Sequence, residues 1–260
     1  MALNRASKKW KASLMRSTLQ NIVSQPRNLL LAFLFDLAFV FIAYILRFTI
    51  LDMLASTMPV AAGWAAALHL LAIIIFYSAI KFIVLVLISE YSQKKQRQDY
   101  SRIMPFIILN AALGLILTIL LLMPILVNLI PVSQGLAIFI YWAYMATALA
   151  FFYLWLNLSH SFFIIGNGAF GSLGKGLKFT LTQFRKHSGV AGLFVSAALV
   201  IAVLVLLMDL GLRLALNAET INISYPRIAM WLTYATLFIF YLLHAFCRAY
   251  FLDICLKSKA

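Results

Sequence analysis

The residues whose types and spacing come closest to a chemical motif lie between positions 166 and 192, in the segment GNGAFGSLGKGLKFTLTQFRKHSGVAG. Residues 166–171 have the spacing G-x-G-x-x-G, with which a dinucleotide-binding protein lets its backbone approach a pyrophosphate. That motif must follow a β-strand, whereas here it follows a long apolar segment. A phosphate-binding loop ending at Lys175 would need glycine at 169 and serine or threonine at 176, and the chain has Ala169 and Gly176. The segment therefore does not favour nucleotide binding.

The same segment makes sense as an amphipathic helix. At about 100° per residue, its apolar side chains fall within an arc of roughly 80°. These are Phe170, Leu173, Leu177, Leu181 and Phe184, and the basic residues Lys175, Lys178, Arg185 and Lys186 lie on the flank and the opposite side. Such a helix lies in a membrane interface, with its apolar face in the acyl boundary and its cations among lipid phosphates. We expect an interfacial elbow helix over about 168–188, with the four basic residues as lipid-headgroup ligands.

Ionisable residues inside apolar segments are a second set of candidates, because they are costly in a membrane and often functional. Asp36 lies about 12 Å, and Lys81 about 13 Å, from the predicted cytoplasmic ends of their segments, at 1.5 Å per residue. The two groups can therefore share a depth, and we expect an Asp36–Lys81 ion pair. A static link between two helices is the favoured interpretation. The alternative is a site for a proton or a headgroup phosphate, with Lys81 as the cation.

Three further polar residues lie in the predicted inner halves of later segments. They are Asn110, His160 and His244. A lone histidine in a membrane segment is usually a hydrogen-bonded packing residue. Together with Asp36 and Lys81, however, the three could meet at one depth and line a polar cavity.

The elements that must position these residues are long apolar helices. The chain has 260 residues, 65% of them hydrophobic and 11% charged, more apolar surface than a soluble domain can bury. Six segments exceed the ~20 residues that an α-helix needs to cross a bilayer. They run over about 28–54, 63–89, 103–130, 134–165, 189–216 and 228–252. We predict an all-α, polytopic membrane bundle of six transmembrane helices plus two interfacial amphipathic helices.

The distribution of lysine and arginine predicts the orientation. Basic residues gather in the N-terminal arm, in the loops near 94–102 and 175–186, and in a tail that includes Arg248. The positive-inside rule then places both termini in the cytoplasm, in a multi-pass protein of the cell membrane. We expect a basic amphipathic arm over 1–27 and a membrane domain over 28–260. The net charge of +14 favours anionic lipid headgroups, and no nucleic-acid partner is expected.

The inventory for catalysis is poor. The zinc-protease motif H-E-x-x-H is absent, and Ser172 lacks the first glycine of a G-x-S-x-G nucleophile elbow. Only 7 acidic residues occur, so paired carboxylates are hard to assemble at one depth. Cys247 and Cys255, about 12 Å apart along one helix, are too distant for a mutual disulfide. We expect no catalytic residue, no metal site and no cofactor.

The layout resembles a group of prokaryotic six-helix membrane proteins of unknown function. It is similar to the membrane domain that accompanies some glycerophosphodiester phosphodiesterases. The resemblance rests on the entry to the first span, from Leu19-Gln20 through Pro26 to Leu29, and on the glycine-rich, lysine-containing elbow from Gly168 to Gly189. It implies a helical bundle and leaves the activity open, because the chain has no phosphodiesterase domain.

Two functions remain in view. The first is a membrane protein without catalytic activity, whose basic cytoplasmic face associates with anionic lipids, a membrane partner protein or a second copy of the chain. The alternative is a transporter or lipid-handling protein with an intramembrane site at Asp36 and Lys81.

Overall fold

A computed structural model describes residues 14–52, 62–92, 100–124, 133–183, 189–190 and 218–257, with isolated positions between 193 and 211. Nearly all of these residues are helical, and they include no strand. The elements are α2 (Pro26–Leu46), the π-helical η1 (Arg47–Asp52), α4 (Ala62–Ser92), the 3-10 helix η3 (Tyr100–Arg102), α5 (Ile103–Leu122), α6 (Gln134–Ile164), α7 (Ala169–Thr182) and α9 (Ala218–Lys257). Residues 14–24 are also helical. The predicted all-α helical bundle is confirmed.

Five helices of the described residues are long and apolar enough to cross a membrane. They cover Pro26–Ile50, Trp64–Ser89, Tyr100–Leu122, Gln134–Ile164 and Thr233–Lys257. These ranges match the first four predicted spans and the sixth. The fifth predicted span, 189–216, lies largely outside the described residues.

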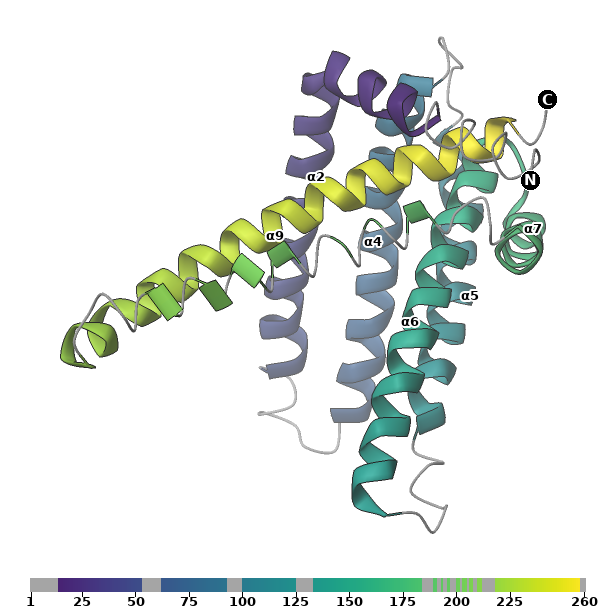
Figure 1. The fold of residues 1–260 in the computed structure, drawn as a ribbon. Helices are drawn as coiled ribbons and strands as arrows, with labels where there is room; N and C mark the ends of the chain where they lie inside the picture. Colours follow the sequence, from purple (N-terminus) through teal and green to yellow (C-terminus); the bar gives the residue numbers. More distant parts are fainter. Residues whose placement is uncertain are drawn as a thin grey trace.

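Four of these helices run alongside one another, and α9 slants across them (Figure 1). In sequence order, α2 packs on α4 and α4 packs on α5, as short connections between antiparallel helices favour. Helix α9 packs on both α4 and α6. Its slanted path therefore brings its side chains to helices far apart in the sequence.

The buried core lies at one end of this bundle. In α6, every buried residue falls between Phe152 and Ile164, in the last 13 positions of the helix. The buried residues of α9 with described side chains likewise begin only at Ala245, and those of α5 lie within its first 11 positions. Since α6 and α9 end where α5 begins, these halves meet. The opposite halves are mostly exposed apolar surface.

The turn after α6 is built to redirect the chain. Gly166 has a φ of 107°, a left-handed conformation that glycine adopts without strain. The N–H of Asn167 donates to the carbonyl of Phe162 at 3.2 Å, and the N–H of Gly166 donates to that of Phe163 at 3.0 Å. This pair of bonds closes the helix C-terminus as a Schellman motif. Gly168, in contrast, is extended with φ −71°, which any residue can adopt.

Helix α7 follows this turn and packs on α6 and α5. It lies beside the end of the bundle at which α6 ends (Figure 1). A Cβ added to Gly176 would come within 2.9 Å of the backbone nitrogen of Ser159 and would collide with its hydroxyl. Glycine at 176 therefore allows the close approach of α7 to α6.

Candidate functional site

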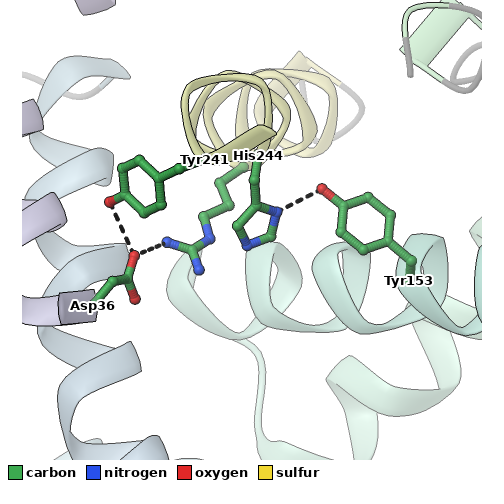
Figure 2. A network of polar contacts seen from close by, with 5 residues as sticks. Asp36, Tyr153, Tyr241 and His244 are labelled. Carbon is green, nitrogen blue, oxygen red and sulfur yellow. Dashed lines mark hydrogen bonds and ion pairs between the residues drawn. The ribbon is translucent and has the colours of Figure 1, made fainter. Parts of the chain in front are cut away.

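The candidate site is a network of polar side chains inside the buried half of the bundle. Asp36 of α2 receives hydrogen bonds from two residues of α9 (Figure 2). The Arg248 guanidinium donates from Nη1 at 2.7 Å, which makes an ion pair, and the Tyr241 hydroxyl donates at 3.0 Å. The Arg248 side chain is 6% exposed and that of Asp36 is 20% exposed. The pair thus ties the first described span to the last.

The predicted pairing of Asp36 with Lys81 is wrong, because the cation in contact with Asp36 is Arg248. The sequence pattern places Arg248 in the basic tail, but α9 extends to Lys257, so Arg248 lies inside its last apolar span. The slant of α9 then carries the guanidinium to α2. A sequence fixes a residue's depth along its helix but not the side of the helix that each neighbour covers.

Lys81 is buried in α4, only 3% exposed. Its ammonium group has no ion pair with a described carboxylate, and it lies 5.9 Å from the centre of the Tyr77 ring on the same helix. It interacts electrostatically with both Arg248 and Asp36. Asp36, Arg248 and Lys81 therefore form a cluster of two basic side chains and one carboxylate. With all three ionised, this cluster carries one uncompensated positive charge.

His244 extends the network toward α6. Its Nδ1 lies 2.7 Å from the hydroxyl of Tyr153, on the far side of the α9 side chains from Asp36 (Figure 2). Tyr241, His244 and Arg248 are spaced i, i+3 and i+7, which places them on one face of α9. That face connects α2 with α6.

His160 joins α6 to α5. Its Nε2 lies 2.8 Å from the Asn110 carbonyl oxygen, while the Asn110 amide nitrogen donates to the carbonyl of Phe106 at 3.0 Å. The amide nitrogen is thereby used, so the Asn110 oxygen accepts and His160 Nε2 donates. His160 Nδ1 is buried without a hydrogen-bond partner, and the ring interacts electrostatically with Lys81 and Arg248.

The five intramembrane residues predicted from sequence fall into this one region, but they do not form one contact. Asp36 pairs with Arg248, His244 with Tyr153, and His160 with Asn110, while Lys81 lies among them. Sequence reasoning missed the tyrosines, since a tyrosine in an apolar segment gives no signal. It also missed Arg248, although the i, i+4 spacing from His244 was a usable signal.

The predicted elbow helix coincides in part with α7. Lys175 and Lys178 are exposed, and Lys175 Nζ donates to the side-chain oxygen of Asn167 at 2.5 Å. Arg185 and Lys186 lie outside the described residues. The predicted apolar stripe differs from the observed packing, because Leu173 and Leu177 are half-buried against the core.

The start of α7 is held by a cation from another helix. The Arg102 guanidinium donates to the carbonyls of Phe163 and Asn167, at 2.8 and 2.6 Å. These carbonyls lie at and just beyond the C-terminal end of α6, where the helix dipole favours positive charge. Arg102 thus fixes the turn from which α7 departs.

Among the described residues, no group of three or more histidine, cysteine, aspartate or glutamate side chains could hold a metal ion. Cys247 and Cys255 are buried free thiols. Comparisons with protein-family models, with curated proteins and with solved structures found no match. The resemblance to the six-helix membrane domains therefore stays a prediction.

Proposed function

We propose that this chain is a multi-pass protein of the cell membrane, without catalytic activity, whose basic cytoplasmic end binds anionic lipid headgroups. The observation that carries the proposal is the exposed face of α7. Phe170 and Leu181, 74% and 64% exposed, share this face with the exposed Lys175 and Lys178. Apolar side chains beside ammonium groups suit the boundary between acyl chains and headgroups.

The packing of α7 supports this role. Ser172, Gly176, Phe179 and Thr180 are buried on its other face, so the helix is already fixed to the bundle. At about 100° per residue, Phe170 and Leu181 lie within roughly 20° of each other, and Lys178 and Lys175 follow at about 60° intervals. Each lysine near an anionic surface contributes about 1 kcal/mol to lipid binding.

The orientation belongs to the same proposal. The basic arm, the loop near 94–102 and the segment after α6 carry most of the charge, so the positive-inside rule assigns their end of the bundle to the cytoplasm. With the inner leaflet at that end, α7 meets the anionic lipids of that leaflet. A membrane partner protein or a second copy of the chain would meet the same basic surface.

Native mass spectrometry of the purified protein in mild detergent tests the proposal. We expect the wild type to retain anionic phospholipid, and the variant Lys175→Gln/Lys178→Gln to retain several-fold less, with the difference shrinking as salt increases. The matched control is Arg16→Gln/Lys257→Gln, which removes two exposed charges that do not belong to α7. Equal loss in both variants would show that net charge, rather than the α7 face, holds the lipid. If a second polypeptide were retained in stoichiometric amount, the result would identify a protein partner, and not lipid, as the ligand of this surface.

A further inference from the structure

We propose that the buried cluster around Lys81 is a second binding site, for one phosphate group with a single negative charge. It is separate from the α7 surface in residues and in environment, because Lys81 and Arg248 are buried while Lys175 and Lys178 are exposed. The site lies where α4 and α9 meet, beside α2 and α6.

Charge balance is the first argument. Asp36 compensates Arg248 through a direct ion pair, and Lys81 has no described carboxylate in contact. An ammonium group inside a membrane is costly unless an opposite charge or several hydrogen-bond acceptors surround it. One monoanion next to Lys81 would make the cluster neutral.

Unused donors are the second argument. Lys81 donates no hydrogen bond to a described residue, and the Nε of Arg248 is buried without a partner. Guanidinium and ammonium groups are the side chains that proteins use for phosphate, as a planar fork and as a point charge.

The place of the cluster favours the headgroup of a lipid as the source of this phosphate. Lys81 lies nine residues before Glu90, about 13 Å along the helix, so the site is below the level of the headgroups. Asp36 keeps 20% of its side chain exposed on α2, so the network reaches the surface of the described bundle there. A free phosphate ion has the same chemistry, and the experiment separates the two sources.

The test measures thermal unfolding in detergent, in the Lys175→Gln/Lys178→Gln background so that α7 does not contribute. Three probes are added: short-chain phosphatidylglycerol, a short-chain glycosyl diacylglycerol without phosphate, and inorganic phosphate. A ligand that binds only the folded state raises the unfolding temperature. We expect phosphatidylglycerol to raise it by several degrees and the glycolipid to leave it unchanged. A comparable rise with inorganic phosphate would also support the site and identify a soluble anion as its ligand.

Variants at position 81 tie the effect to the site. We expect Lys81→Met to weaken phosphatidylglycerol binding at least tenfold and Lys81→Arg to retain it. Should Lys81→Met not fold, Lys81→Gln takes its place. An equal temperature rise in the wild type and in the neutral variants would overturn the site, as would the absence of any phosphate-dependent rise. Neither of these negative results would change the amount of lipid that the α7 face retains in the mass-spectrometry experiment. The phosphate site and the α7 proposal are therefore tested separately.

Discussion

Asp36 and Arg248 form an ion pair that joins two helices, α2 and α9. The carboxylate accepts hydrogen bonds from Arg248 and Tyr241 of α9, which replaces part of the hydration that both charges lose on burial. A buried pair of this kind adds little stability beyond an apolar pair of the same volume. Removing only one member of the pair is costly, because the other charge then stays buried without a partner.

This asymmetry gives the first prediction, on the thermodynamic coupling of the pair. We expect Asp36→Asn to lower the free energy of unfolding by roughly 3–5 kcal/mol, since it leaves Arg248 and Lys81 as uncompensated cations. The double variant Asp36→Asn/Arg248→Met should lose less than the single variant, because the buried charge is removed as well. Denaturant titrations in detergent measure both. If the double variant lost as much stability as the single variants Asp36→Asn and Arg248→Met together, the contact would carry no coupling energy.

At the scale of elements, three separate contacts hold the junction of α6 and α7. The Schellman motif at Gly166, the Arg102 contacts to two carbonyls and the close approach at Gly176 act on one short segment. Each fixes a different degree of freedom: the turn, the end of α6 and the distance between the helices. The exposed face of α7 is therefore presented in one orientation.

Two glycines of α7 give a matched pair of variants. We expect Gly176→Ala to destabilise the protein by about 1–3 kcal/mol, because its Cβ would overlap the backbone of Ser159. Gly174→Ala should instead stabilise it by up to ~1 kcal/mol, since nothing lies within 4 Å of its Cβ and alanine is the better helix former. Thermal unfolding measures both effects: the unfolding temperature should fall for Gly176→Ala and rise for Gly174→Ala. Stabilisation of both would contradict the close packing of α7 on α6.

At the scale of the whole molecule, the described basic residues Arg102, Lys175 and Lys178 lie at the same end of the bundle as the buried core. The N-terminal helical residues belong to this end, because the Thr18 hydroxyl donates to Asp253 near the end of α9 at 2.5 Å. Leu14 and Ile22 of the same segment are buried in the core. The predicted N-terminal arm thus packs, from residue 14 onward, on the helices of the bundle.

The proposed orientation gives a prediction for the whole chain. A fluorescent protein fused to either terminus should fluoresce, because both termini are assigned to the cytoplasm. Alkaline phosphatase fused after Thr57, in the first predicted outer loop, should be active, and at either terminus it should be inactive. Phosphatase activity at one terminus only would imply an odd number of spans.

Much of the fold could be predicted, because long apolar runs permit few structures in a membrane. The bounds of α4 and α6 are within two residues of the expected spans at every end but one, the C-terminal end of α4. The partner of Asp36 could not be predicted, because the angle at which α9 crosses the bundle depends on the packing of whole helices. The same limit applies to Leu173 and Leu177, whose periodicity indicated an apolar face without showing that it faces protein rather than lipid.

The concentration of buried residues at one end has a consequence for how the molecule responds to its bilayer. Separating the far ends of α4, α5 and α6 would expose little buried surface, whereas separating their near ends would break the core. Local opening should therefore begin at the far ends, which amide hydrogen exchange would register as weak protection there and strong protection around Leu158 and Tyr250. Bilayer thickness and lateral pressure then act mainly on the loosely joined ends, and the polar network at the buried end keeps its geometry while they move.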